Sequence, residues 1–280
     1  MKKFKIGMLS VLSLILTHTL NAQDRQFVRT YQSNTLAKGA VDIESWATFR
    51  TGRSYFYNRL DTRLEFETGL TDKLQSAFYF NASHMAFGPS KDTLGGIADT
   101  SMVGIFQESE FSVSSEWKLN LINSATHPFG FAAYVEFGIA PTQYEIETKL
   151  IFDKKTEKNM FALNLVNEYE LKYEIDKDEN KAGWATEDES EIDIAYMHMF
   201  RPSFGLGLEV VNSNEIEHGA WNFSALYAGP TIFYSGGKHF LILNFLPQLT
   251  NLHKTDDAPN NLVLNAREKM EVRLLWGFNF

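Results

Sequence analysis

The sequence predicts an all-β protein, a closed antiparallel transmembrane β-barrel of about twelve strands with short periplasmic turns and longer extracellular loops. Three observations predict this fold class: an export signal at the N-terminus, apolar residues that alternate with polar ones along most of the chain, and connections that alternate between short and long. In a bilayer, each backbone N–H and C=O needs an internal partner. Strands can therefore cross it only as a closed barrel.

Composition excludes several other classes of protein. The 280 residues include no cysteine, which rules out disulfides, thiolate metal sites and a cysteine nucleophile. A charged fraction of 22% and a mean hydropathy of -0.24 do not fit a bundle of membrane helices, each of which needs about 20 consecutive apolar residues. The net charge of -9 argues against a nucleic-acid binder, which normally carries a basic surface.

The N-terminus has the pattern of a secretory signal peptide. Lys2, Lys3 and Lys5 precede an apolar run at residues 6–16, and Ala22 supplies the small residue before the expected cleavage site. The apolar run is too short to span a bilayer. The chain is therefore expected to divide into a signal peptide (1–22), an N-terminal periplasmic segment (23–37) and an outer-membrane barrel (38–280).

Period-two alternation is clearest in the last eleven residues. One face carries Met270, Val272, Leu274, Trp276, Phe278 and Phe280, and the other carries Glu271, Arg273, Leu275, Gly277 and Asn279. Similar patterns predict twelve strands, near residues 40–50, 55–68, 74–85, 106–119, 130–140, 144–153, 160–173, 190–200, 204–212, 220–234, 239–249 and 268–280. The strand at 239–249 has the weakest pattern, because residues 241–246 are apolar on both faces.

The connections support the same fold. If both chain ends are periplasmic, the even-numbered connections should be short, and most are, such as residues 201–203 and 235–238. Three odd-numbered connections are predicted to be much longer, at residues 86–105, 174–189 and 250–267. The first and fifth connections are tight hairpins and do not follow this trend.

A soluble β-sandwich would show the same alternation with its apolar face turned inward. Two features favour the membrane barrel. The polar faces carry dense mixed charge rather than the small polar residues of a solvated surface. Aromatic residues recur near the predicted strand ends, as the interfacial girdles of a membrane barrel require; they are Trp46, Tyr55, Tyr57, Trp117, Tyr196, Phe200, Trp221, Trp276 and Phe278.

The aromatic last strand, which ends in Phe280, resembles that of Gram-negative outer-membrane β-barrel proteins. This resemblance implies that Trp276, Phe278 and Phe280 form an assembly signal for the barrel-assembly machinery, and that outer-membrane lipid and lipopolysaccharide surround the chain. Three segments also resemble a poorly characterised family of porin-like outer-membrane transport proteins, some of them linked to phenol-degradation pathways. They read LAKGAVDIE from Leu36, GLTDKLQ from Gly69 and SEWK…PFGFAAYVE from Ser115. The similarity spans most of the mature chain, but these motifs are strand and turn signatures.

No catalytic residue, metal site or cofactor is expected. No histidine falls on a lumen-facing position at membrane depth, so a serine nucleophile would lack its general base, and neither G-x-S-x-G nor H-E-x-x-H occurs. An outer-membrane hydrolase is therefore the third choice of function.

One segment partly matches a calcium-binding loop. Asp176, Asp178, Asn180 and Glu187 fit positions 1, 3, 5 and 12, but Lys181 occupies position 6, where the sharp turn needs glycine. We expect an acidic, solvated outer loop there, with a weak divalent contact as the alternative.

Charged residues on the polar faces are the main candidate site. The predicted lumen charge network comprises Asp42, Glu44, Arg59, Asp61, Arg63, Glu65, Glu108, Glu110, Glu116, Lys118, Glu168, Glu170, Lys172, Glu191, Asp193, Glu271 and Arg273. Such charges can rigidify a narrow lumen or select the sign of a permeating solute. We expect a narrow pore or transporter for small solutes; the alternative is a closed structural or surface-interaction barrel. The lumen should have an acidic arc opposite a mixed one.

Overall fold

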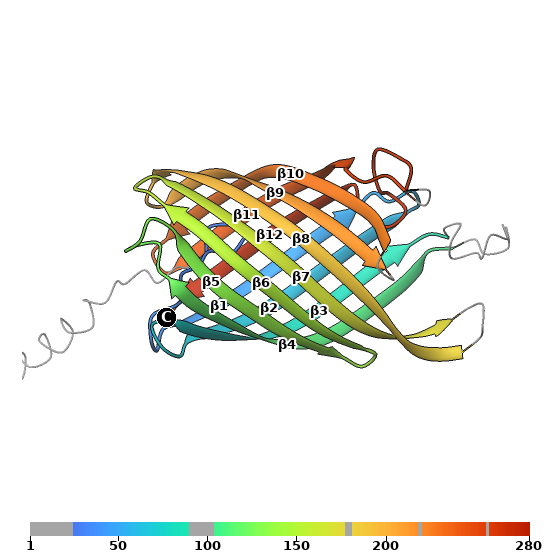
Figure 1. Ribbon diagram of the computed structural model, residues 1–280, viewed down its shortest axis with the longest axis horizontal. Helices are drawn as coiled ribbons and strands as arrows, with labels where there is room; N and C mark the ends of the chain where they lie inside the picture. The colour runs from blue at the N-terminus through green and yellow to red at the C-terminus, as the bar shows by residue number, and fades with distance from the viewer. Residues whose placement is uncertain (1–24, 90–103, 177–180, 218–219, 256–257) are drawn as a thin grey trace, which may run out of the picture.

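The computed structural model describes residues 25–89, 104–176, 181–217, 220–255 and 258–280, so the expected signal peptide lies outside the described residues. It is a closed barrel of twelve antiparallel strands (Figure 1), which confirms the predicted fold class. The strands are β1 (Val41–Thr51), β2 (Tyr57–Gly69), β3 (Leu74–Phe87), β4 (Phe106–Ile122), β5 (Gly130–Ala140), β6 (Gln143–Lys155), β7 (Asn159–Asp176), β8 (Lys181–Arg201), β9 (Phe204–Glu217), β10 (Ala220–Gly236), β11 (His239–Asn251) and β12 (Met270–Asn279). Among the described residues, no helix is long and apolar enough to cross a membrane.

Pairing of the first and last strands closes the barrel. Each strand pairs with its neighbours in the chain, and β1 pairs antiparallel with β12, with Ser45 opposite Trp276. The Phe280 amide also donates to the Val41 carbonyl, at 3.0 Å. Each of the described strands therefore pairs with a neighbour on both sides of the closed barrel, which is the condition for a sheet to lie in hydrocarbon.

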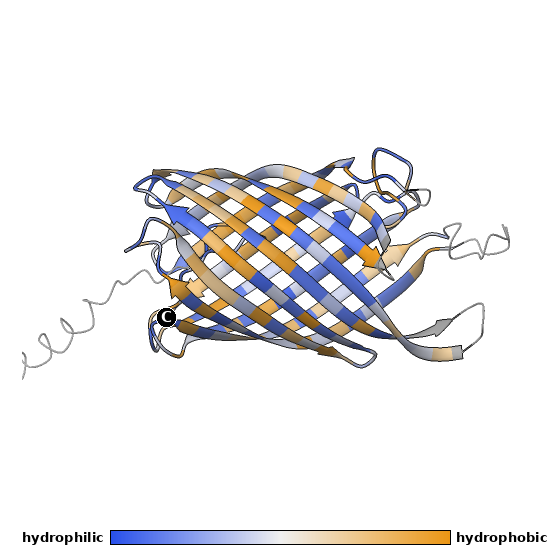
Figure 2. Cartoon of the chain, viewed as in Figure 1, coloured by the Kyte–Doolittle hydropathy of each residue, from blue (hydrophilic) through white to orange (hydrophobic). Residues whose placement is uncertain are grey.

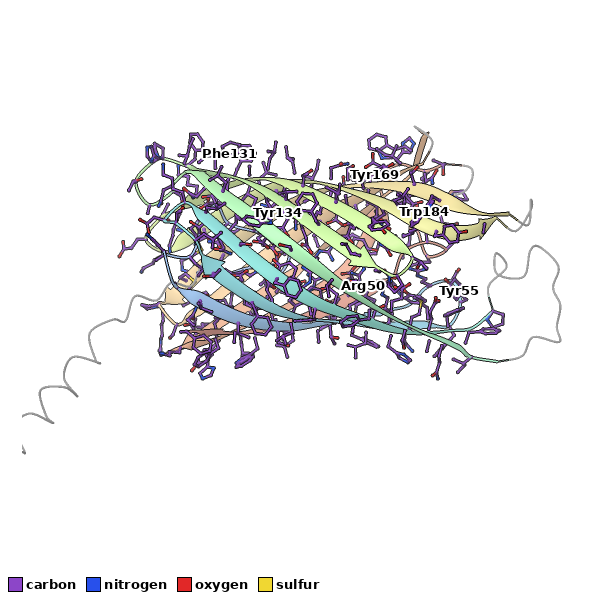
Figure 3. All side chains as sticks on the ribbon, turned by 90° about the horizontal axis from the view of Figure 1, so that it is seen from below. Arg50, Tyr55, Phe131, Tyr134, Tyr169 and Trp184 are labelled. Carbon is purple, nitrogen blue, oxygen red and sulfur yellow. The ribbon has the colours of Figure 1, made fainter. Side chains whose placement is uncertain are left out.

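The two faces of each strand carry different side chains. On β12, Leu274 and Trp276 are 47% and 39% exposed on the outside, while Leu275 between them is fully buried in the interior. Tyr169 and Trp184 likewise lie on the outer surface, and Tyr134 lies inside (Figure 3). Apolar and polar residues therefore alternate along the ribbons (Figure 2). An exposed apolar belt of this kind is typical of a barrel that is surrounded by lipid.

The two ends of the barrel differ in their connections. One end carries the C-terminus and short turns such as 202–203 and 237–238 (Figure 1); we call it the short-turn end. The other end carries the connections 88–105 and 252–269, and we call it the long-loop end.

The prediction of a third long loop at residues 174–189 is wrong. Its described residues, 174–176 and 181–189, extend β7 and β8 as a paired hairpin, in which Lys172 lies opposite Ala185. Tyr173 and Trp184 pack edge to face on its outer side, with 5.2 Å between ring centroids. This part of the hairpin lacks the regular apolar alternation of the other strands, so the sequence pattern did not mark it as strand. Of the residues that suggested a calcium loop, Asp178 and Asn180 lie outside the described residues, and Glu187 lies on β8 opposite Glu170.

The N-terminal segment also differs from its expected position in the periplasm. Residues 25–36, which we call the lumenal segment, lie inside the barrel, where Phe27, Val28 and Leu36 are fully buried. Their polar neighbours gave no local signal for this burial. In the lumen the apolar side chains of the segment leave water, and side chains of the wall replace water as partners of its backbone.

An apolar cluster in the lumen surrounds the lumenal segment and explains the weak pattern of β11. Phe27 and Val28 belong to the same buried cluster as Phe240 and Ile242, which are inward residues of β11. β11 is therefore apolar on both faces because one face contacts lipid and the other contacts the segment. At the long-loop end, Val263 of the β11–β12 connection belongs to a second buried cluster inside the barrel.

The face assignment predicts the effect of placing a charge on the lipid side. Leu64, at the middle of β2, is 39% exposed on the outer surface. Leu64→Arg should lower the free energy of unfolding in lipid bilayers by about 2–4 kcal/mol, because a cation near the bilayer midplane loses its hydration. Glu65→Gln, one residue away and inward, should cost less. Equal losses in denaturant titrations of the two variants would contradict the assignment.

Candidate functional site

The barrel contains a cavity of about 1120 Å³ between the lumenal segment and the long-loop end. Its floor is formed by Arg25, Val28, Arg29 and Tyr31 of the segment, and its wall reaches the β5–β6 turn at residues 141–142. No described histidine lines it. The cavity is therefore a charged vestibule, closed below by the chain's own N-terminal residues.

All members of the predicted lumen charge network point into the barrel, but only part of the network lines the cavity. The lining members are Arg59, Asp61, Arg63, Glu108, Glu110, Glu168, Glu170, Lys172, Glu191, Asp193 and Arg273. The remaining members are buried in the interior: Asp42, Glu44, Glu65, Glu116, Lys118 and Glu271. The assembly-signal residues Trp276, Phe278 and Phe280 lie on the opposite, outer face of β12.

Several charged residues of the interior are not in the predicted network. Strand parity could have found Arg50, Glu136, Glu145, Glu147, Lys149 and Glu209, because they alternate with outward apolar residues. The others lie in segments that the sequence analysis took for loops, turns or a free N-terminus; they are Arg25, Arg29, Arg53, Glu187, Glu189, Glu215 and Arg267. Parity within a strand cannot place these residues.

Six glutamates from six consecutive strands form one continuous row across the sheet. Each lies directly opposite the next in the register, in the order Glu116, Glu136, Glu147, Glu168, Glu189 and Glu215. We call them the glutamate row. Neighbouring strands are about 4.8 Å apart, and like charges directly opposite each other are destabilising. The row therefore concentrates negative potential along β4–β9, the acidic arc that the sequence predicts.

Cations offset part of this row. Arg63 lies 3.2 Å from Glu136, and Lys149 lies 2.9 Å from Glu147. Arg267, in the β11–β12 connection, pairs with Glu189. In the part of the chain that the structure describes, Glu168 has neither a hydrogen bond nor an ion pair.

Glu168 stands in a group of carboxylates. Its carboxylate and those of Glu145 and Glu170 have ligand atoms within 4.8 Å of one another. Of the three, Glu170 pairs with Lys172. The middle of the acidic arc therefore presents to the cavity carboxyl groups that lack a cationic partner among the described residues.

The wall across the barrel is rich in arginine. Arg50 of β1 lies 2.8 Å from Asp61 and 3.3 Å from Glu271, and Arg59 of β2 donates to the same Asp61. This wall is the mixed arc expected from the sequence, and β1 is six strands away from β7 in the closed order. A solute in the cavity experiences a transverse field between the two arcs.

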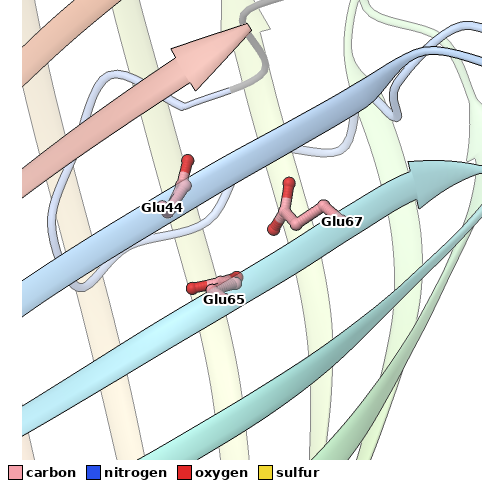
Figure 4. Close-up of side chains that lie close together, drawn as sticks. All are labelled: Glu44, Glu65 and Glu67. Carbon is pink, nitrogen blue, oxygen red and sulfur yellow. The ribbon is translucent and has the colours of Figure 1, made fainter. Parts of the chain in front are cut away.

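Two arginines attach the lumenal segment to the barrel wall. Arg25 lies 2.8 Å from Glu44 and 3.7 Å from Glu65. Glu44, Glu65 and Glu67 form a buried group of carboxylates on the adjacent strands β1 and β2 (Figure 4). Burying this group without a cation would be costly, so Arg25 is a counter-charge as well as an anchor.

The second anchor, Arg29, joins strands on different sides of the barrel. Its guanidinium lies 3.1 Å from Glu191 of β8 and 3.0 Å from Glu271 of β12. Pairing with two separate strands fixes both the position and the orientation of the segment.

Backbone hydrogen bonds complete the attachment. The fully buried carboxylate of Glu209 accepts from the amides of Val28, Arg29 and Thr30, at 2.8–3.0 Å. The Asn164 amide both donates to and accepts from the backbone of Tyr31. Side chains of the wall therefore replace the partners that a strand would give this segment, and the short-turn half of the lumen is filled.

The barrel has the same fold as several solved structures of outer-membrane proteins. It resembles an outer membrane channel from Pseudomonas putida F1, with a TM-score of 0.61 and 13% identity over 90% of this chain and 100% of that chain. It also resembles the NanC porin, with a TM-score of 0.51 and 11% identity over 85% and 100% of the two chains. A third similar structure is the beta domain of the Bordetella autotransporter BrkA, with a TM-score of 0.56 and 6% identity over 87% and 100%. At these identities the likeness shows the fold alone.

Sequence comparison gives a family without an activity. The model of a family described as "Family of unknown function (DUF6662)" matches residues 19–280. Among curated proteins, none matches the sequence significantly.

The Glu209 contacts predict how the lumenal segment is held. Glu209→Ala should raise hydrogen exchange at the amides of Val28 and Thr30 by at least about tenfold, because each hydrogen bond to a charged group contributes about 1.5–3 kcal/mol. Glu215→Ala is the matched control, since Glu215 lies on the same strand and bonds Asn222 instead. Unchanged exchange in the Glu209 variant would show that other contacts hold the segment.

Proposed function

We propose that this chain, which belongs to the Family of unknown function (DUF6662), is an outer-membrane channel for small solutes. The observation that carries the proposal is the charged cavity of about 1120 Å³ inside a closed barrel with an apolar outer surface. Interiors that are lined by fixed charges bind and select solutes by their charge and size. The solved structures with the same fold include an outer membrane channel and a porin, which supports this proposal.

The outer surface supports a location in the outer membrane. Its exposed apolar residues are suited to contact with lipid and, on the outer leaflet, with lipopolysaccharide. Phe280 is 65% exposed at the end of the last strand, where the barrel-assembly machinery could bind it together with Trp276 and Phe278. No catalytic group is proposed for the cavity, because its lining offers no nucleophile paired with a histidine base.

The lumenal segment makes the proposed channel narrow. It fills the short-turn half of the lumen, so a solute that enters from the long-loop end meets Arg25 and Arg29 on the cavity floor. Passage then requires the segment to shift, and a small unitary conductance follows. The second candidate function, a closed surface or scaffold barrel, is favoured by the same filled lumen.

Removal of the segment separates these two functions. Deletion of residues 25–36 behind an intact signal peptide should raise the unitary conductance in planar bilayers several-fold, because the charged vestibule would then be continuous with the short-turn end. Heat-modifiable migration on gels checks that the barrel has folded. If the full-length protein never conducts, even at high voltage, and only the deletion variant does, the closed scaffold is the better function.

The acidic arc predicts a preference for cations. Glu110 and Glu168 both line the cavity, and neither forms an ion pair in the described part of the chain. Neutralising both with Glu110→Gln and Glu168→Gln should move the reversal potential in a salt gradient towards that of an unselective pore. Glu157→Gln, which changes an exposed residue of the β6–β7 turn, is the control. An anion preference in the unchanged protein would contradict the prediction.

A further inference from the structure

We propose that Arg273 and Trp46 form a binding site for the carboxylate group of a small solute in the wall of the cavity. The inference rests on the proposed function and deepens it, because it names one group of the solute. That group binds locally in the mixed arc, whereas the acidic arc sets the preference for small cations. It concerns binding rather than passage, so it can be tested on a barrel that does not conduct.

The first observation is that Arg273 has no counter-ion. Eight arginines line the cavity. Seven of them form ion pairs with carboxylates; they are Arg25, Arg29, Arg50, Arg53, Arg59, Arg63 and Arg267. Arg273 is the exception within the described ranges.

The strand register explains why Arg273 is unpaired. Its direct neighbours across the sheet are Thr48 on β1 and Asn244 on β11, and both are neutral. The nearest carboxylate on its own face, that of Glu271, is already bound by Arg29 and Arg50. These two arginines bring further positive charge to the same region of the wall.

The Arg273 side chain is held in one orientation. Its Nε donates to the Thr48 hydroxyl at 2.5 Å, and its guanidinium carbon lies 4.3 Å from the centre of the Trp46 ring. The terminal Nη groups make no hydrogen bond to any residue that the structure describes. Because Arg273 is only half-buried and belongs to the cavity lining, a solute in the cavity can reach it.

The geometry matches a carboxylate. A guanidinium presents parallel N–H groups, which fit the two oxygens of a planar carboxylate in a bidentate pair. With Nε used by Thr48, the terminal groups are the donors that remain. Trp46 lines the cavity instead of the interfacial girdle expected from the sequence, and the guanidinium carbon of Arg63 lies 5.0 Å from the centre of the same ring.

Binding of butyrate to the purified barrel tests this site. Butyrate should quench tryptophan fluorescence in a saturable way, and this change should disappear in Trp46→Phe. Arg273→Gln should abolish saturable binding in calorimetry. Arg273→Lys keeps the positive charge but loses the parallel N–H groups of the guanidinium, and should weaken the affinity for butyrate about tenfold.

Arg59→Gln is the matched control, because it removes the same charge from the same cavity at a position that is paired with Asp61. It should change the affinity for butyrate less than twofold. If the Arg59 and Arg273 variants lost the same amount of affinity for butyrate, the site would be overturned. Butyrate would then be attracted by the overall positive potential of the cavity and not by Arg273 itself. Unchanged binding in Arg273→Gln would also overturn it.

Inorganic phosphate and chloride distinguish a carboxylate site from a general anion site. Chloride, which cannot accept two parallel hydrogen bonds on separate oxygens, should not displace butyrate at equal concentration and ionic strength, and displacement by chloride would overturn the site. Phosphate fits the same fork, so displacement by phosphate at lower concentration than butyrate would overturn the carboxylate assignment. This test and the test of the proposed function can fail separately. Saturable butyrate binding without conductance would support the carboxylate site and reject the channel. Conductance without butyrate binding would support the channel and reject the carboxylate site.

Discussion

Closure of the backbone hydrogen-bond ladder between β1 and β12 is the constraint on which the rest of this molecule depends. In hydrocarbon, an unpaired strand edge would cost several kcal/mol for each exposed polar group. Once the barrel is closed, every strand has one face in lipid and one in the lumen. The apolar exterior and the charged interior both follow from this geometry.

The closed barrel also brings carboxylates close together in its interior, and the strands alone do not supply enough cations to pair with them. The register sets glutamates from β4 to β9 directly opposite one another, and it collects buried carboxylates on β1 and β2. Part of the compensation comes from outside the strands. Arg25 and Arg29 enter with the lumenal segment, and Arg267 enters with the β11–β12 connection. These irregular segments are therefore components of the lumen rather than appendages.

This arrangement links the shape of the lumen to its charge. The segment that closes the short-turn half also supplies the cations on the cavity floor, so a movement that opened the lumen would also change its electrostatic field. Arg273 differs from these groups because it is held by Thr48 and Trp46 and has no carboxylate partner. A wall in which the other arginines are paired therefore leaves one cation available for a solute.

The sequence by itself determined the strands and the faces of this barrel. Period-two alternation is a local property, so Leu274 and Glu271 could be assigned to opposite faces without knowledge of any partner strand. Only the tertiary structure decided three other features. The β7–β8 hairpin extends beyond the regular apolar alternation. Residues 25–36 are mainly polar, and they are buried because distant groups of the wall, such as Glu209 and Asn164, bind them. The glutamate row and the unpaired Arg273 arise from the register between strands. Register depends on contacts between residues far apart in the chain, and no local pattern carries that information.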